Sequence, residues 1–173
     1  RRWLSARASV ADGRAYVRLD DLTFERPRET ARARGATGGA DGLIEAATFA
    51  RDDVDRIGVW DDEANARKFC CSTDMATRGL CGKDEVGRMV IQTRGDDDES
   101  RTPWRTEIWF EGDDATARSD VQAVSVRETG MYYMWFVVCD PEHAGVTVSG
   151  RTLWKNPDGY LPGAKTALLP FYG

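Results

Sequence analysis

The sequence predicts an all-β fold, an antiparallel β-sandwich with one short helical turn and stapling disulfides. Short apolar runs rich in aromatic and β-branched residues recur along the chain, separated by Gly, Pro and Asp turns. One run, residues 131–138, is apolar at both alternating sets of positions, as expected of a strand covered on both faces. Four cysteines form an even set without zinc spacing, which favours disulfides over a metal site.

Length and composition fit one globular domain of 173 residues, with 41% hydrophobic and 31% charged residues. The net charge is -5, but it is unevenly spread, because residues 1–34 hold nine Arg against five acidic residues. The acidic remainder argues against nucleic acid as the main partner. The Arg-rich start is read as a compositional bias rather than a binding patch. No pattern in the chain calls for a cofactor.

Turn and breaker residues divide the chain into four parts. Residues 1–24 are predicted to form an N-terminal hairpin around Asp12-Gly13, and residues 25–41 a mobile loop rich in Gly, Arg and Ala. Residues 42–159 then form the sandwich core. Residues 160–173 are apolar but aperiodic and contain two prolines, so they are predicted to be an extended connector.

Within the core, short runs with strand composition follow one another at the spacing of an all-β domain. They cover residues 42–49, 59–60, 66–71, 86–93, 104–111, 121–128, 131–139 and 145–155. Between two of them, Ser72 or Thr73 is placed to cap one helical turn that Gly79 ends. Asn156-Pro-Asp-Gly159 is a strong turn signal.

The four cysteines predict two disulfides and therefore an oxidising compartment. A bond between the neighbours Cys70 and Cys71 is disfavoured, because it requires strained geometry. Strand alternation puts Cys71 on the face of Phe69, which is expected to point inward. This favours Cys71–Cys139 with Cys70–Cys81. The swapped pairing, Cys70–Cys139 with Cys71–Cys81, is the close alternative, and four reduced, buried thiols in a cytosolic domain are the remaining one.

Two polar features are candidates for chemistry. His143, the single histidine, follows the strand at 131–139, but no nucleophile or orienting partner stands at a recognisable spacing, so no catalytic residue is assigned. A run of four carboxylates is a candidate for weak calcium binding. Calcium loops alternate ligands with spacers and bend at an internal Gly, so a solvated acidic loop is the favoured interpretation. The run consists of Asp96, Asp97, Asp98 and Glu99.

Several aromatic side chains are candidates for lining a groove for a glycan, lipid or peptide, although aromatic residues in strands more often fill the core. They are Trp104, Trp109, Tyr132, Tyr133, Trp135 and Trp154. A second, overlapping set flanks the 156–159 turn or lies in the apolar tail, where amphipathic rings suit a membrane interface. This set, the possible membrane-proximal contact, consists of Trp154, Tyr160, Phe171 and Tyr172.

Three segments, read together, resemble one family. The first is residues 42–46 with Phe49 and residues 53–58, and the second is the double-cysteine segment 69–76 with residues 79–81. The third is residues 129–132 with 139–141, followed by the run 153–163 and the closing Phe171-Tyr-Gly173. They are similar to the luminal ectodomain of the lung seven-transmembrane receptor family in its plant and algal form, also called GOLD-domain seven-transmembrane proteins. The resemblance implies a GOLD-like sandwich whose C-terminal connector leads to a first transmembrane helix. Residues 1–41 and 94–101 lie outside it.

In that family the ectodomain is linked to Golgi and endosomal trafficking and to cell-surface signalling, and it carries no assigned catalytic residues. The expected function is therefore a non-enzymatic ectodomain on the luminal or extracellular side, with a protein partner and with a membrane reached through a following transmembrane region. The alternative is a structural or interaction module of a cell-surface or filamentous assembly. The two differ in whether about 20 apolar residues follow Gly173 in the full-length protein.

Overall fold

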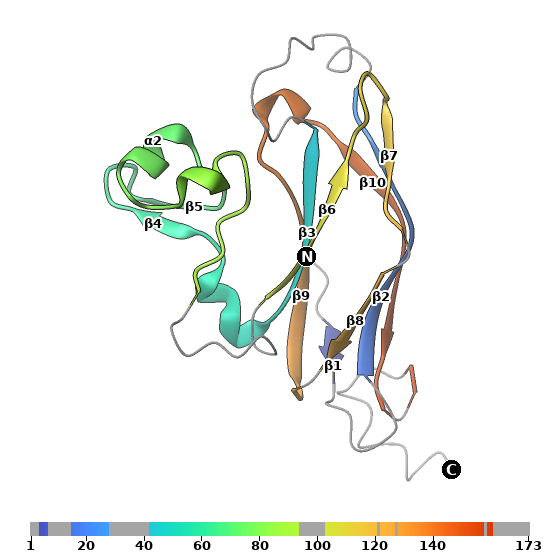
Figure 1. Ribbon diagram of the computed structural model, residues 1–173. Helices are drawn as coiled ribbons and strands as arrows, with labels where there is room; N and C mark the ends of the chain where they lie inside the picture. The colour runs from blue at the N-terminus through green and yellow to red at the C-terminus, as the bar shows by residue number, and fades with distance from the viewer. Residues whose placement is uncertain are drawn as a thin grey trace.

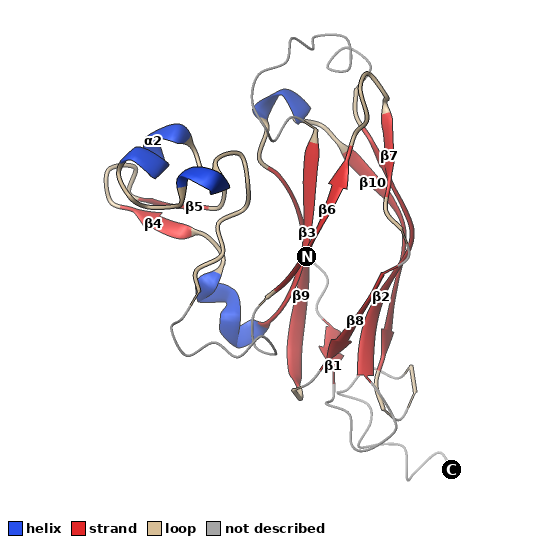
Figure 2. Cartoon of the chain, in the orientation of Figure 1, coloured by secondary structure: helices blue, strands red, loops and turns tan. Residues whose placement is uncertain are grey.

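The computed structural model describes residues 4–6, 15–27, 42–93, 103–120, 122–126, 128–157 and 159–160. Two antiparallel sheets face each other, and a small lobe projects from one of them (Figures 1 and 2). The strands are β1 (Leu4–Ala6), β2 (Ala15–Glu25), β3 (Leu43–Ala50), β4 (Val59–Asp61), β5 (Ala66–Lys68), β6 (Trp104–Trp109), β7 (Thr116–Arg118), β8 (Gln122–Val126), β9 (Gly130–Val138) and β10 (Thr147–Lys155). The helical turns are η1 (Arg51–Arg56), α2 (Thr73–Thr77), η2 (Lys83–Glu85) and η3 (Pro141–His143). The predicted all-β sandwich with a short helical turn is confirmed.

The first sheet has the strand order β1-β9-β3-β6. Its most buried strand is β3, in which every residue from Leu43 to Phe49 is buried. β9 pairs with it antiparallel, from Ile44 opposite Val138 to Ala50 opposite Tyr132. All residues of β9 are only half-buried, however. The sequence predicts a strand covered on both faces here, and β9 lies inside the sheet between β1 and β3, but it is less buried than the alanine-rich β3.

The second sheet has the order β10-β2-β7, and β8 also pairs with β2. The long β2 carries the inward side chains, with Val17, Leu19 and Phe24 almost inaccessible to solvent. Its register with β10 shifts between Ser149 and Arg151. Gly150 has φ +134° there, and an added Cβ would stand 2.8 Å from the Asp21 carbonyl oxygen, so the shift requires glycine. β10 is the edge strand on this side.

The main core lies between the two sheets. Phe24 from β2 meets Phe136 from β9 edge to face, with ring centroids 5.5 Å apart. Ile44 from β3 and Ile108 from β6 complete the buried apolar layer. This arrangement explains why β9 alternates two apolar sets: Phe136 and its neighbours of the same parity face this core, and the other set faces the lobe.

The lobe, residues 57–92, has a small apolar core of its own. Met75 from α2 packs there with Cys71 and Val90. The Ser72 hydroxyl caps α2 by accepting a hydrogen bond from the Met75 N–H at 3.2 Å, which confirms the predicted helical turn. Across the lobe, Arg78 donates two hydrogen bonds of 2.8 Å to the Asp61 carboxylate and holds the pKa of that group well below its usual range.

Two local predictions are wrong. β1 pairs with β9, whereas β2 lies in the other sheet, so residues 1–24 do not form the predicted hairpin. The run 86–93 was predicted to be a strand, but it makes only single bridges, Met89 to Cys70 and Ile91 to Ile57. Its backbone hydrogen bonds go to the short segment 69–71 on one side and to residues 56–58 on the other, and neither contact extends into a ladder. The short β7 gave no recognisable signal in the sequence.

Three predictions fall on residues that the structure does not describe. They concern residues 28–41 of the predicted loop at 25–41, the candidate calcium residues Asp96 to Glu99, and the tail with Phe171 and Tyr172. Among the helices in the described ranges, none has the length and apolar character needed to cross a bilayer.

Candidate functional site

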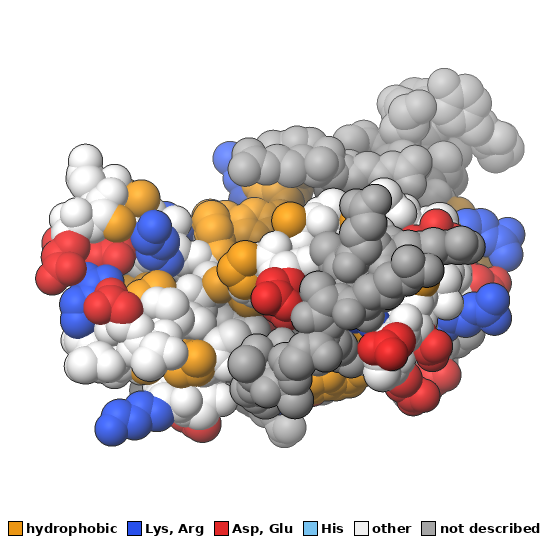
Figure 3. Space-filling view, turned by 90° about the horizontal axis from the view of Figure 1, so that it is seen from above, with side chains coloured by type: hydrophobic (Ala, Val, Ile, Leu, Met, Phe, Trp, Pro, Cys, Tyr) orange, Lys and Arg blue, Asp and Glu red, His pale blue; other side chains and the backbone are white. Residues whose placement is uncertain are grey.

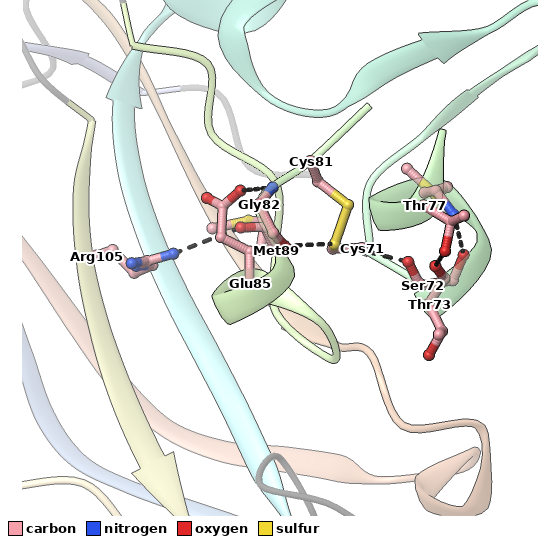
Figure 4. Close-up of a disulfide and its surroundings, with 10 residues drawn as sticks. Cys71, Ser72, Thr73, Thr77, Cys81, Gly82, Glu85, Met89 and Arg105 are labelled. Carbon is pink, nitrogen blue, oxygen red and sulfur yellow. Dashed lines mark hydrogen bonds between the residues drawn. A yellow bond between two sulfur atoms is a disulfide. The ribbon is translucent and has the colours of Figure 1, made fainter. Parts of the chain in front are cut away.

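The disulfides are Cys70–Cys139 and Cys71–Cys81, which is the swapped pairing (Figure 4 shows Cys71–Cys81). The favoured pairing assumed strand alternation through Cys71, but β5 ends at Lys68 and the alternation ends with it. Cys71 is buried in the core of the lobe, next to Cys81. Cys139 directly follows β9, so its bond to Cys70 fastens the lobe to the end of that strand.

Phe69, the neighbour of Cys70, is held against the outer side of the first sheet. Its ring meets the Trp135 ring edge to face, with centroids 5.5 Å apart. Gly58 allows this approach, since an added Cβ would stand 2.9 Å from Phe69 Cδ1 and 2.6 Å from the Lys68 carbonyl oxygen. Phe69 was predicted to point inward. It is instead 38% exposed, which corrects that prediction.

A second apolar layer joins the lobe to the sheet. Phe49 of β3 is buried there with Ile57 and Met89 of the lobe, and half-buried side chains of β9 pack against them. The Phe49 and Trp135 rings meet edge to face at 5.1 Å. β3 and β9 are therefore covered on both faces, on one by the second sheet and on the other by the lobe.

One buried carboxylate reinforces this layer. Glu45 of β3 is 1% exposed and accepts a hydrogen bond from the Met89 N–H. Arg105 of β6 places Nη1 3.4 Å from Glu45 Oε1. The same nitrogen lies 3.4 Å from the Met89 carbonyl oxygen (Figure 4). Burial raises the pKa of Glu45, although the Met89 N–H and the cations Arg105 and Arg88 act in the opposite direction.

The raised pKa of Glu45 predicts a specific pH dependence. Folding favours the protonated form, so the stabilising contribution of Glu45 is complete below about pH 4.3, the ordinary glutamate value, and is lost as the pH rises through the folded-state pKa. Between pH 4 and 8 the stability of Glu45→Gln should therefore rise relative to wild type. Urea unfolding at fixed pH values measures this difference. If the stability of Glu45→Gln relative to wild type stays constant or falls as the pH rises, the raised pKa of Glu45 is contradicted.

An apolar groove of about 660 Å³ runs along β9 between the lobe and β10. We call it the β9 edge groove. Its lining consists of Phe24, Ile44, Phe69, Met134, Trp135, Phe136, Val137, Val138, Val146 and Val148. Phe69 and Val148 are 38% and 45% exposed, respectively. Seen from above, hydrophobic side chains reach the surface in the middle of the molecule, beside the more charged lobe (Figure 3).

The groove continues into a more polar hollow of about 510 Å³ at the register shift of β10. The two share Phe136 and Val148 as lining residues. On the polar side, Arg18 Nε lies 2.7 Å from Asp20 Oδ1, and Arg151 is largely exposed. The β9 edge groove and this hollow thus form one depression, which is apolar along β9 and polar at the register shift of β10.

The candidate groove aromatics separate into two groups. Trp104, Tyr132 and Trp154 pack against the cores between the sheets, and Tyr133 packs against the layer under the lobe. Trp135 does line the β9 edge groove, whereas Trp109, 39% exposed, lies on the opposite edge strand. Phe69 and Val148 were not singled out from the sequence. Neither carries a local signal, because the fold alone brings them to β9.

The remaining candidates are placed as follows. Trp154 packs inward on Val17 and Val126, and its indole N–H donates to the Thr152 hydroxyl at 3.2 Å. Tyr160 is 63% exposed. His143 is buried, with its ring 5.7 Å from that of Phe110 and Nε2 3.6 Å from Asp140 Oδ2. The possible membrane contacts stay predictions.

The fold and the groove define a class of protein. It is a disulfide-bonded β-sandwich with a side lobe and an apolar groove that runs along β9 between the lobe and β10. The chain matches no protein-family model, no curated protein and no solved structure. Within the described ranges, no group of three or more His, Cys, Asp or Glu side chains is arranged to hold a metal ion. All four cysteines are in disulfides, so none of them offers a free thiol as a nucleophile.

Proposed function

We propose that this chain is a non-enzymatic recognition domain that binds a protein partner in the β9 edge groove. The observation that carries the proposal is the groove itself. It brings two exposed apolar side chains, Phe69 and Val148, together in a lining whose side chains are all apolar. Contiguous apolar surface of this kind is costly to leave in water and characteristically marks a binding site.

The proposed location is the luminal or extracellular side of a membrane. Two disulfides support it, because such bonds persist in oxidising compartments and are rare in the cytosol. The further proposal, that the chain precedes seven transmembrane helices and acts in trafficking or cell-surface signalling, is supported by the sequence resemblance alone.

Site-specific photo-cross-linking tests the proposal. The full-length protein carries p-benzoylphenylalanine in place of Phe69 and is irradiated in its source cells, and adducts are identified by mass spectrometry. The matched control places the same group at Val86, which is 37% exposed on the lobe and does not line the groove. We expect a discrete protein adduct from position 69 and none from position 86.

Two other outcomes are informative. An adduct between two copies of this chain would favour the alternative, a module that assembles with itself. Equal labelling from positions 69 and 86, or no adduct from either, would contradict recognition through the groove.

A further inference from the structure

Three covalent links join the lobe to the sandwich. The chain enters the lobe at residue 57 and leaves it at residue 92, and these two crossings lie side by side, because Ile57 pairs with Ile91 in a single antiparallel bridge. The third link is the Cys70–Cys139 disulfide. The other disulfide, Cys71–Cys81, lies within the lobe, and no cysteine is left over for a further bond.

The crossings and the Cys70–Cys139 bond hold the lobe at different levels of the first sheet. Ile57 is buried in one apolar layer with Phe49, which stands opposite Tyr133 of β9. Cys139 directly follows Val138, and β9 rises about 17 Å from Tyr133 to Val138. The two crossings therefore form a hinge at one level, and the disulfide fixes the lobe at a second one.

The lobe is built as a body of its own. The β4-β5 pair, α2 and a small apolar core all lie within residues 57–92. Cys71–Cys81 closes this core, and Arg78 donates two hydrogen bonds to the Asp61 carboxylate across it. Since none of these contacts involves Cys70 or Cys139, the lobe keeps its internal structure when the bond between those two is broken.

The surface on which the lobe rests includes a buried charge. Glu45 of β3 is 1% exposed and accepts a hydrogen bond from the Met89 N–H of the lobe, with Arg105 Nη1 3.4 Å from its other oxygen. Arg88 of the lobe also pairs with Glu107 of β6, but both are partly exposed, so this pair contributes little. The dehydration of Glu45 opposes docking of the lobe. The disulfide offsets this cost, and the apolar layer alone bears it after reduction.

The two disulfides differ in access. Cys70 and Cys139 are both half-buried, and their neighbours Phe69 and Val138 line the open β9 edge groove. Cys71, by contrast, is 3% exposed in the core of the lobe. Thiol–disulfide exchange requires that a thiolate reach one of the sulfur atoms. A reductant should therefore reach the Cys70–Cys139 bond before the Cys71–Cys81 bond.

We infer that the Cys70–Cys139 disulfide is a redox-sensitive latch, whose reduction by a dithiol lets the lobe rotate about residues 57 and 92 and move away from β9. One thiolate of the dithiol attacks a sulfur of the bond, forms a mixed disulfide with that cysteine and releases the other cysteine as a thiolate. The second thiolate of the dithiol then displaces the first cysteine. Two electrons pass to the protein, Cys70 and Cys139 take up protons, and the dithiol leaves as a disulfide.

The latch acts on one wall of the β9 edge groove. Among the lining residues, Phe69 belongs to the lobe, and its ring meets the Trp135 ring edge to face. When the lobe moves, Phe69 leaves the groove, and partner binding weakens. This consequence for the partner rests on the proposed function, whereas the latch itself does not.

Amide hydrogen exchange of the 173-residue chain, followed by NMR, tests the latch. The Met89 N–H donates to Glu45 across the interface, whereas the Val90 N–H donates to the Phe69 carbonyl oxygen inside the lobe, at 2.9 Å. A general loss of stability lowers the protection of both amides alike, but movement of the lobe exposes Met89 alone. In Cys70→Ala/Cys139→Ala, we expect the ratio of Val90 protection to Met89 protection to rise at least tenfold over oxidised wild type.

The Cys71→Ala/Cys81→Ala variant is the matched control, because it loses a disulfide but keeps the latch. The ratio of Val90 protection to Met89 protection should not rise in this variant. An unchanged ratio in Cys70→Ala/Cys139→Ala would overturn the latch, and so would an equal rise in both variants.

The order of reduction is measured on wild type. The protein is exposed to increasing concentrations of dithiothreitol, alkylated with iodoacetamide and analysed by peptide mass spectrometry. We expect Cys70 and Cys139 to be alkylated at lower dithiothreitol concentrations than Cys71 and Cys81. Simultaneous alkylation of all four, or the reverse order, would overturn selective reduction of the latch.

Failure of the latch can be distinguished from failure of the proposed function, because neither measurement needs a partner. If both give the expected result while position 69 of the oxidised protein captures no protein, the latch stands and the proposed function falls. If position 69 captures a partner but the protection ratio is unchanged, only the latch falls.

Discussion

Removing the Cys70–Cys139 disulfide by a double substitution to alanine should lower the free energy of unfolding by about 4 kcal/mol. The bond joins residues 69 apart in the sequence and ties the lobe to the end of β9. Closing a long loop reduces the entropy of the unfolded chain more than closing a short one. Urea denaturation of the oxidised proteins measures the loss.

The second disulfide is the matched control for the first. Cys71–Cys81 joins residues only 10 apart, and the same entropy argument gives about 2.5 to 3 kcal/mol for its removal. If the loss for the Cys70–Cys139 double variant does not exceed the loss for the Cys71–Cys81 double variant, the long bridge is not the main fastening between lobe and sandwich.

Phe49→Ala should destabilise the protein by about 3 to 5 kcal/mol, the usual cost of deleting a buried phenylalanine ring. Phe49 is 2% exposed and packs against Trp135 and Tyr133 in the layer under the lobe. The substitution leaves a cavity between the lobe and the first sheet. These two parts cannot easily move together to close the cavity, because the Cys70–Cys139 disulfide fixes their spacing.

Phe69→Ala is the control for Phe49→Ala. Phe69 contacts the same Trp135 ring but is 38% exposed, so its truncation should cost less than half as much stability while it weakens partner binding. Chemical denaturation of both variants compares the two losses. A Phe49→Ala loss under about 1 kcal/mol would mean that the lobe does not cover this face of the sheet.

The fold class could be predicted because its signals are local. Alternating apolar runs, turn residues such as Asn156 to Gly159 and the Ser72 cap each act within a few residues, and the structure contains the corresponding elements. Burial was harder to predict. The aromatic β9 was predicted to be covered on both faces, yet its residues are only half-buried, whereas β3, with its small residues, packs closely on both faces and lies deeper.

The pairing of elements far apart in the chain could not be predicted from the sequence. The choice between the two cysteine pairings depended on where β5 ends, a boundary that propensity does not fix. The β9 edge groove could not be predicted for the same reason. Phe69 and Val148 are 79 residues apart in the numbering, and only the topology brings both to β9. The apolar character of residues 131–138 indicated a covered strand and gave no sign of a groove beside it.

Amide hydrogen exchange along β9 is the most direct test of the account. Met134 to Val138 line the β9 edge groove, so a bound partner should cover them. Binding of the protein captured by the photo-cross-link at position 69 should slow amide exchange at Met134 to Val138 and leave exchange at Val86 on the lobe unchanged. Exchange at Met134 to Val138 that is unaffected by a saturating concentration of that protein would contradict the account.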